Sequence, residues 1–518
     1  MGSRKTSIYG GLTVVFCLGL LVPSLASASP GPDFNGDGYG DLAVGAPYEH
    51  GIGSVRVLYG GPSGLSTTGS QFFTHDTPGM KMVEYSGGFG RTLAVGDFNH
   101  DIFDDLAVSE VDVGSGSPSV HIVYGSPSGL TVQANQLLTP ATFLGLRPGR
   151  DTTFGISLAT GKINRDRIDD LVIGAPERDP ARRRIEGAAV RLLGGEKRLR
   201  VAGARIFNAY QANLRENDSV LGPEFGRALA IGRFNRGRAN DLAIGAPYGT
   251  GGFGDVAVLL AGQNKGLKAS RNQLLTTTTP GIGGDQHPRY DDHFGSALEA
   301  ADFNDDRRSD LVIGVRDSRH GGAIHVLYGS RLGPSLHGDR YWTTDTPGIR
   351  GPDGRPGDIF GSSFSSSDLN GDGFADLVVG AANTSAAYPG VPSRGRDGDG
   401  GVHILYGSRR GLTPKGDIFL SQLDPGLADN GIGADGLGVG LGGGDFNADG
   451  FGDLVIGEQQ YPAYSEDCPG GGAIHVLYGS PNPLDPDAAQ YFDADSAGMA
   501  GGGSRQCASF GAALTAGR

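Results

Sequence analysis

The stretch DFNGDGYGD, Asp33–Asp41, decides the fold, and the apolar run LAVGAP follows it directly. Oxygen ligands fall at its alternate positions: the side chains of Asp33, Asn35, Asp37 and Asp41, and the backbone carbonyl of Tyr39. A hard divalent cation of the size of calcium prefers such a set of converging oxygen ligands. The sequence therefore predicts a calcium-binding loop at this place.

The same stretch also fits the first half of a helix–loop–helix calcium hand. That motif needs a glutamate at loop position twelve and a helix on each side. Position twelve here is Val44, and the flanking segments are short apolar runs bounded by glycine. Such runs indicate β-strands, so we expect the calcium loop to lie within a β-hairpin.

This loop recurs in seven copies, whose first residues lie 64 to 77 residues apart. A repeat of this kind indicates an array of equivalent structural units. Four further copies keep the complete ligand pattern of the first: Asp97, Asn99, Asp101, Phe103 and Asp105; Asp302, Asn304, Asp306, Arg308 and Asp310; Asp368, Asn370, Asp372, Phe374 and Asp376; Asp445, Asn447, Asp449, Phe451 and Asp453.

The two remaining copies depart from the pattern. The third begins with Lys162, whose ammonium group would oppose a cation, and the fourth begins with Arg233 and has Gly237 in place of the central acid. Arg233 could instead pair with Asp241 of its own loop. Arg308 of the fifth copy supplies only its carbonyl, so we expect that loop to bind. The sequence thus predicts about five calcium sites, with the third copy uncertain and the fourth empty.

Each copy lies within the same frame of apolar runs. A strand opened by Phe-Gly precedes the loop, a strand such as DLVIGAP follows it, and third and fourth strands come after, the third ending in Tyr-Gly or its equivalent. Four short strands joined by turns form one blade of a β-propeller. The predicted fold is therefore all-β, a seven-bladed β-propeller of four-stranded blades.

The two ends of the chain complete this picture. The first copy has no Phe-Gly strand before it, whereas Phe510–Leu514 supplies one with no loop after it. We expect this C-terminal strand to complete the first blade, because closing the ring removes the unpaired edges of a linear array. Cys468 and Cys507 are expected to form a disulfide near this closure, with two free thiols as the alternative.

The N-terminus predicts secretion. Residues 1–28 fit a signal peptide, with Arg4 and Lys5 before an apolar run and a small-residue cleavage site at Ala26–Ala28. An uncleaved anchor is the alternative. Residues 29–518 are then expected to form a single domain, and no other segment could insert into a membrane.

Phe-Gly, then the aspartate loop, then Gly-Ala-Pro, repeated along the mature chain, resembles the FG-GAP repeat of the N-terminal β-propeller of integrin α subunits. Similar repeats occur in secreted bacterial proteins. The resemblance implies a seven-bladed propeller with calcium in the hairpins between first and second strands. It does not by itself assign a function, since propellers include both enzymes and binding proteins.

Composition restricts the partners. The formal net charge of the 518-residue chain is −14, which argues against nucleic acid or an anionic membrane as the main partner. Histidines recur at one position of the third strand, which predicts a structural role at separate blades rather than a metal cluster: His121, His325, His403 and His475.

Two functions fit these observations. The first is a calcium-binding adhesion module, acting as a monomer, that binds an extracellular protein or glycan through variable loops such as Ile282–His293, Ala381–Asp399 and Glu458–Gly470. The alternative is an extracellular lyase or hydrolase acting on polysaccharides at the mouth of the propeller. An enzyme would need Lys, Arg, Tyr or His side chains from several blades to converge near the axis. The sequence favours the non-enzymatic function and identifies no catalytic residue.

Overall fold

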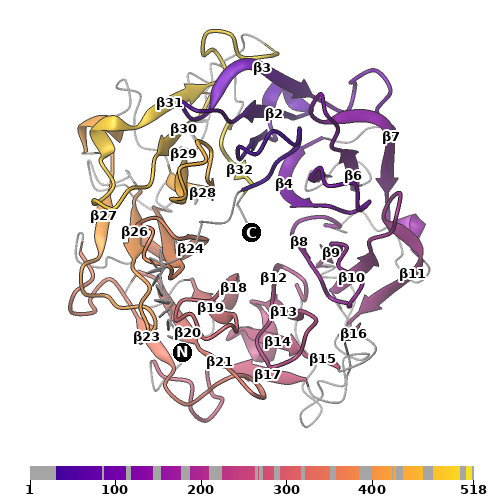
Figure 1. The fold of residues 1–518 in the computed structure, drawn as a ribbon. Helices are drawn as coiled ribbons and strands as arrows, with labels where there is room; N and C mark the ends of the chain where they lie inside the picture. The colour runs from indigo at the N-terminus through magenta and orange to yellow at the C-terminus, as the bar shows by residue number, and fades with distance from the viewer. Residues whose placement is uncertain are drawn as a thin grey trace, which may run out of the picture.

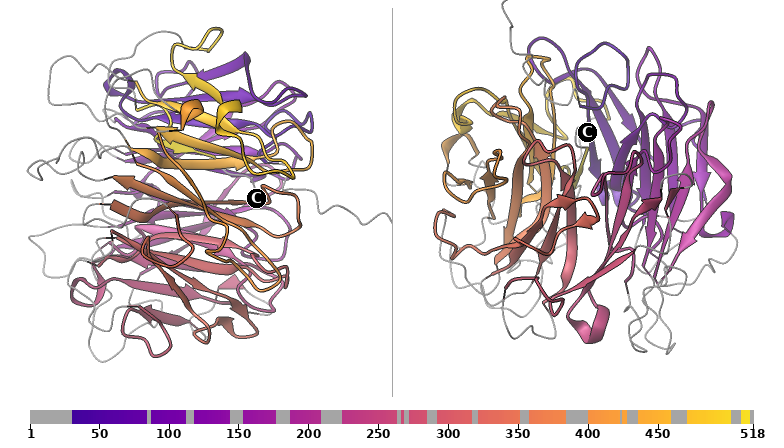
Figure 2. Two further views of the ribbon diagram at one scale, coloured as in Figure 1. Left: turned by 90° about the vertical axis from the view of Figure 1, so that its left-hand side faces the viewer. Right: turned by 60° about the horizontal axis from the view of Figure 1, so that its bottom comes forward.

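Seven four-stranded antiparallel sheets surround a common axis and form the predicted seven-bladed β-propeller (Figure 1). The computed structural model describes residues 31–83, 87–111, 118–143, 153–176, 187–208, 224–262, 266–267, 272–284, 292–316, 321–350, 358–383, 400–422, 424–427, 436–458, 471–501 and 509–515. The predicted signal peptide, Cys468 and Cys507 lie outside these residues. Figure 2 shows the strands running from one face of the ring to the other.

Each blade has its first strand next to the axis and its fourth at the periphery. In this order the strands of blades 1 to 4 are β32 (Ala513–Leu514), β1 (Leu42–Ala46), β2 (Ser54–Tyr59) and β3 (Ser66–Phe73); β4 (Phe89–Gly96), β5 (Asp105–Glu110), β6 (Ser119–Tyr124) and β7 (Thr131–Leu138); β8 (Leu158–Gly161), β9 (Asp170–Ala175), β10 (Ala188–Leu193) and β11 (Arg200–Phe207); β12 (Ala228–Gly232), β13 (Asp241–Ala246), β14 (Asp255–Leu259) and β17 (Gln273–Thr276).

Blades 5 to 7 follow the same order. Their strands are β18 (Phe294–Ala301), β19 (Asp310–Val315), β20 (Ala323–Leu327) and β23 (Arg340–Trp342); β24 (Asp358–Ser367), β25 (Asp376–Asn383), β26 (Val402–Leu405) and β27 (Ile418–Leu420); β28 (Leu437–Gly444), β29 (Asp453–Glu458), β30 (Ala473–Leu477) and β31 (Gln490–Asp493). Elsewhere in the described residues there are two small hairpins and short helical turns: β15 (Ala261–Gly262) with β16 (Gly266–Leu267), β21 (Gly329–Ser330) with β22 (Gly333–Pro334), α1 (Gly249–Gly252), η1 (Glu49–Gly51), η2 (Pro140–Thr142), η4 (Pro425–Leu427) and η5 (Pro486–Ala488).

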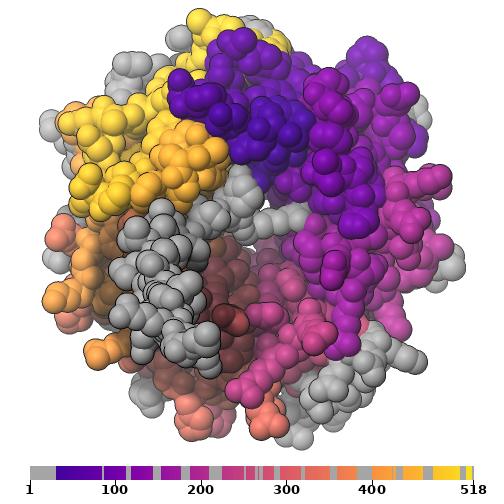
Figure 3. Space-filling view, in the orientation of Figure 1, coloured from indigo at the N-terminus to yellow at the C-terminus, as the bar shows by residue number. Residues whose placement is uncertain are grey.

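The ring closes as the sequence predicts. Strand β32 pairs antiparallel with β1, with Val44 opposite Leu514 and Gly45 opposite Ala513. The two ends of the described chain therefore share blade 1, and Figure 3 shows the indigo and yellow parts of the surface side by side. Closure leaves no first strand of the ring without a partner in its blade.

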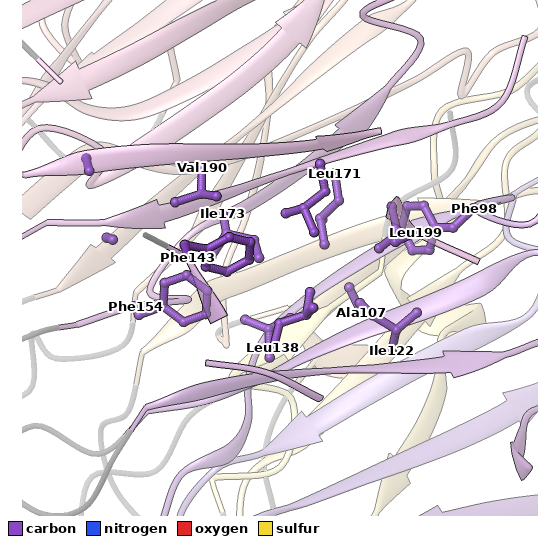
Figure 4. Close-up of a cluster of buried hydrophobic side chains, with 14 of the residues drawn as sticks. Phe98, Ala107, Ile122, Leu138, Phe143, Phe154, Leu171, Ile173, Val190 and Leu199 are labelled. Carbon is purple, nitrogen blue, oxygen red and sulfur yellow. The ribbon is translucent and has the colours of Figure 1, made fainter. Parts of the chain in front are cut away.

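The hydrophobic core lies between the blades. Second strands such as β5, β9 and β13 are buried at every residue. In one cluster, Ala107 and Ile122 of blade 2 lie with Leu171 and Ile173 of blade 3 and with Phe154 of the Phe-Gly pair that opens blade 3 (Figure 4). Burying a large apolar side chain contributes about 1.5–3 kcal/mol. The contacts between blades are therefore a major source of stability.

The recurring glycines permit this close packing of blades. A Cβ atom on Gly45 of β1 would lie 2.0 Å from the carbonyl oxygen of Gly90 in the Phe-Gly pair of the next blade. At the closing interface, a Cβ atom on Gly457 would lie 2.1 Å from the carbonyl oxygen of Gly511. The glycine near the end of the second strand and the glycine after Phe thus meet where two blades touch.

Candidate metal-binding loops

The seven predicted loops connect first strands to second strands. We number them by blade, and we number the positions within each loop from one to nine: loop 1, Asp33–Asp41; loop 2, Asp97–Asp105; loop 3, Lys162–Asp170; loop 4, Arg233–Asp241; loop 5, Asp302–Asp310; loop 6, Asp368–Asp376; loop 7, Asp445–Asp453. Position nine begins the second strand in loops 2 to 7, as at Asp105 of β5.

The aspartate at position nine holds the backbone of its own blade together. In loop 1, Asp41 is fully buried; its Oδ2 accepts the N–H of Phe34 at 2.8 Å and its Oδ1 accepts the N–H of Gly60, beyond β2, at 3.1 Å. In loop 3, which begins with a lysine, Asp170 accepts the equivalent N–H groups of Ile163 and Gly194, each at 3.0 Å. This aspartate therefore has a structural role even where the acid at position one is missing, which the sequence pattern did not show.

Loops 1 and 2 place this buried carboxyl beside further acids. Burial raises the pKa of Asp41 to about 8; bonds from two backbone N–H groups oppose the rise, and the charges of Asp33 and Asp37 add to it. Burial likewise raises the pKa of Asp105 to about 8. A cation bound beside these two carboxyls would favour their ionised form, because a nearby positive charge opposes the effect of burial.

The position-one aspartate is wrapped by its loop. One oxygen of Asp33 accepts the N–H of Gly36 at 2.6 Å, and the other accepts the N–H of Gly38 at 3.0 Å. The amide Nδ2 of Asn35 donates to Asp37 at 2.9 Å. Nowhere in the described part of the chain do three Asp, Glu, His or Cys side chains form a group that could hold a metal ion. A cation would therefore need the asparagine oxygen and a backbone carbonyl as well, both of which the loop contains.

The loops also join neighbouring blades. The N–H of Asp104 at position eight of loop 2 donates to the carbonyl of Asp33 at 2.9 Å, and Gly40 of loop 1 donates to the carbonyl of Asp445 in loop 7 at 2.9 Å. The N–H of Ser126, in the turn after β6, donates to the carbonyl of Phe34 at 3.1 Å. Anything that rigidifies a loop therefore also supports the contact between two blades.

Loops 3 and 4 have basic side chains at position one. The Nζ of Lys162 lies 3.1 Å from Oδ1 of Asp169, a buried carboxylate at position eight. Arg233 differs from the expectation that it would pair with Asp241, because its guanidinium donates to the backbone carbonyl of Arg307 in loop 5. The Nδ2 of Asn235 bonds both oxygens of Asp241 instead, at 2.9 and 2.8 Å.

Loop 5 has the complete ligand pattern but a different internal arrangement. The guanidinium of Arg308 at position seven donates to the carboxylate of Asp306 at position five. The Nδ2 of Asn304 points to the two oxygens of Asp310, at 3.4 and 3.2 Å, as Asn235 does in loop 4. The sequence placed only the carbonyl of Arg308 at this site and did not predict where its side chain goes.

The four repeated histidines occupy equivalent buried positions on separate blades, as their structural interpretation predicts. Each has a buried carboxylate partner: His121 Nε2 lies 2.9 Å from Glu110, His325 Nδ1 2.9 Å from Asp339, His403 Nδ1 3.0 Å from Asp417, and His475 Nε2 3.3 Å from Glu458. In blade 1 the same position holds Arg56, opposite Val44. The histidine pattern does not predict this arginine, although the segment SVRVLYG that contains it aligns with SVHIVYG of blade 2.

A cavity of about 760 Å³ runs along the axis, lined by first strands of the blades. Its lining is mainly small or apolar, with the charged side chains Lys162, Asp169, Glu299, Asp302 and Asp368. Burial raises the pKa of Glu299, whose carboxylate accepts a hydrogen bond from Ser366 at 2.8 Å. Among the described lining residues, Lys162 is the only basic side chain and no Tyr or His is present.

Most of the variable loops named as candidate partner surfaces lie outside the described residues. The structure describes only the ends of Ile282–His293, Ala381–Asp399 and Glu458–Gly470. In the described residues no helix is long and apolar enough to cross a membrane.

Comparison with known proteins identifies the repeat. The model of the FG-GAP repeat matches residues 24–58, 360–405 and 437–477. A phosphatidylinositol-glycan-specific phospholipase D from Rattus norvegicus is 36% identical over 155 residues, covering 28% of this chain and 17% of the phospholipase. Integrin alpha-5 from Xenopus laevis is 29% identical over 244 residues, covering 45% of this chain and 20% of the integrin subunit. The matches therefore span about a fifth of these relatives.

Among solved structures, the six-bladed β-propeller lectin from Aleuria aurantia matches with a TM-score of 0.34 and 8% identity, over 70% of this chain and 90% of the lectin. A likeness this weak supports no inference about ligand or function.

Proposed function

Because the chain is an FG-GAP repeat β-propeller similar to that of integrin α subunits, we propose that it is a secreted, calcium-stabilised binding module for an extracellular protein or glycan. The relatives named above are much longer than their matched segments, so the proposal concerns the propeller alone. Fold similarity does not choose a ligand.

The observation that carries the calcium part is the charge of loops 1, 6 and 7. Each holds aspartates at positions one, five and nine, and no described Lys, Arg or His side chain forms an ion pair with any of them. In loop 1 the ligands would be Asp33, Asn35, Asp37, Asp41 and the carbonyl of Tyr39. Bound calcium would neutralise these carboxylates and hold the loop, together with the blade contacts that the loop makes, in one conformation.

The lining of the axial cavity bears on the choice between binding and catalysis. A lyase or hydrolase at the mouth would need several acid–base side chains to converge there. Among the described lining residues, the one basic group is Lys162, and it is paired with Asp169. The described lining lacks the convergence of Lys, Arg, Tyr or His side chains expected of the enzyme, although Glu299, Asp302 and Asp368 place carboxyl groups there. We assign partner recognition to the loops at the rim of the propeller.

Thermal unfolding with excess calcium and with chelator tests the calcium part. We expect the chelator to lower the melting temperature, and we expect Asp37→Asn to reduce calcium binding by one site. Asp166→Asn at the same position of loop 3 is the matched control, because that loop carries Lys162 and should lose no site. A melting curve unchanged by chelator would contradict the proposal.

An array of glycans and matrix proteins tests the binding part. We expect saturable binding to one ligand class in calcium, weakened by chelator in parallel with the loss of stability. Depolymerisation of a polysaccharide in a parallel assay would instead support the enzyme. Failure to bind any component, with the chain folded and calcium-loaded, would count against the binding module.

A further inference from the structure

Three consecutive loops of the ring contain their own positive charge. In loop 3, the ammonium of Lys162 neutralises Asp169 at 3.1 Å. In loop 4, Arg233 replaces the first acid, and its guanidinium bonds the carbonyl of Arg307 in the adjoining loop 5. In loop 5, the guanidinium of Arg308 bonds Asp306. Each basic group thus occupies or neutralises a place that a metal ion would need.

The asparagine at position three gives a second, independent indication for loops 4 and 5. In loops 1, 2, 3 and 7 its Nδ2 donates to the acid at position five, leaving the acid at position nine to the backbone N–H groups. In loops 4 and 5 the Nδ2 of Asn235 or Asn304 instead covers both oxygens of the acid at position nine. A hydrogen-bond donor in that place excludes a cation from those oxygens. Loop 5 therefore resembles loop 4, although its acidic residues match those of loop 1.

Loops 6, 7, 1 and 2 form the remaining arc of the ring. Among the described ion pairs, one involves an acid of these loops. It joins Asp97 to His100 of loop 2, which is half exposed and lies 3.9 Å away. Their aspartates at positions one, five and nine have no guanidinium or ammonium partner among the described residues. The charge of these four loops is left for a cation to balance.

We propose that calcium binds loops 6, 7, 1 and 2 alone, and that basic side chains take its place in loops 3, 4 and 5. This inference rests on the calcium part of the proposed function and lowers the number of sites from the five that the ligand pattern predicts to four. The four metal-dependent loops lie in consecutive blades on both sides of the closure. Gly40 of loop 1 bonds Asp445 of loop 7 across that closure. Calcium would then act chiefly on the part of the ring where the first and last described strands, β1 and β32, pair.

Calcium stoichiometry of the full chain and two loop 5 variants tests this. Arg308→Phe installs the residue found at this position in loops 2, 6 and 7. Arg307→Gly is the matched control, because it removes the same charge one residue away and introduces the glycine found there in loops 1, 6 and 7. Position 307 has φ +66°, which glycine adopts readily. Isothermal titration with calcium should give about four sites for the wild type and for Arg307→Gly, and about five for Arg308→Phe.

The outcomes separate the two proposals. Five sites in the wild type, or four in a folded Arg308→Phe variant, would contradict the proposal that basic side chains replace calcium in loops 3, 4 and 5. Either result would leave the proposal of calcium binding intact. No calcium bound by any of the three proteins would overturn the calcium proposal itself.

Hydrogen exchange tests the proposal on the wild-type protein alone, without any variant. Chelator should increase exchange in β1, β5, β25 and β29 and change it little in β9, β13 and β19. A uniform increase around the ring would overturn the inference.

Discussion

Glu49→Gln should weaken the closure of the ring more than any single surface change. Glu49 of η1 and Arg56 of β2 are both fully buried and form a bidentate pair, with Nη1–Oε2 at 2.6 Å and Nη2–Oε1 at 2.8 Å. The guanidinium also donates through Nε to the carbonyl of Ala500 in blade 7 at 3.2 Å, and its Cζ lies 5.6 Å from the ring centroid of Phe510, next to the closing strand. The pair therefore joins blade 1, blade 7 and the C-terminal segment.

The expected loss follows from this burial. Desolvation raises the pKa of Glu49, but the hydrogen bonds from Arg56 and Ser54 and the charge of Arg56 outweigh it, so the pKa lies below its usual 4.5. Removing one partner of a buried pair costs about 3–5 kcal/mol, because the other charge stays buried without compensation. Total stabilities are typically about 5–15 kcal/mol, so a loss of this size should be evident. Glu49→Gln keeps the shape of the side chain and some of its hydrogen bonds. We therefore expect a loss in the free energy of unfolding of about 3 kcal/mol, at the lower end of this range.

Urea unfolding in saturating calcium measures the loss, and hydrogen exchange at Ala513–Leu514 locates it. Replacing both partners by apolar residues, as in Glu49→Leu with Arg56→Met, should recover much of the stability. Asp417→Asn, which breaks the pairing of His403 in blade 6, is the control away from the closure. A change below about 0.5 kcal/mol for Glu49→Gln, the size of an ordinary surface substitution, would refute the reasoning. So would an exchange increase that is equal in all blades.

Three further outcomes follow from the described contacts. Asp170→Asn should destabilise the chain by about 1–3 kcal/mol, equally with calcium and with chelator, because two buried backbone N–H groups lose their carboxylate acceptor. A loss seen only in calcium would contradict the structural role of Asp170. Gly45→Ala should lower stability by about 1–3 kcal/mol in thermal melting, since its Cβ would meet the carbonyl of Gly90, and a neutral effect would contradict the close approach of the blades. Burial raises the pKa of Glu110, but the hydrogen bonds and charges of His121 and His75 outweigh this effect, so the pKa lies below its usual 4.5. Its stabilisation is therefore complete above that pH and lost as the pH falls through its folded pKa, so Glu110→Gln should flatten the acid slope of the melting temperature between about pH 5 and 3.

The sequence predicts those features that depend on local, repeated signals. The loop DFNGDGYGD and the Phe-Gly pair recur with a regular spacing, and from them the blade number, the strand order and the closure by Phe510–Leu514 follow correctly. Features that depend on contacts across the fold are not visible in the pattern. Arg308 matches a position where any side chain is acceptable, and only the structure shows that it turns back onto Asp306. Likewise, the pairing of Arg56 with Glu49 joins a regular strand to the helical turn η1, a contact that the repeat pattern does not show.

The closing interface explains why calcium would be used on one side of the ring. Six blades are each built from one continuous stretch of chain, but blade 1 joins the two ends through β32, which pairs with β1 at only two residues. So few ladder bonds give little stability of their own, and the closure depends on side chains and on the neighbouring loops. Arg56 supplies a fixed charge there, and loops 1 and 7 each hold carboxylates that repel one another within the loop. A dication bound in each of these loops would balance that charge, as the basic side chains of loops 3 to 5 do there under the same proposal.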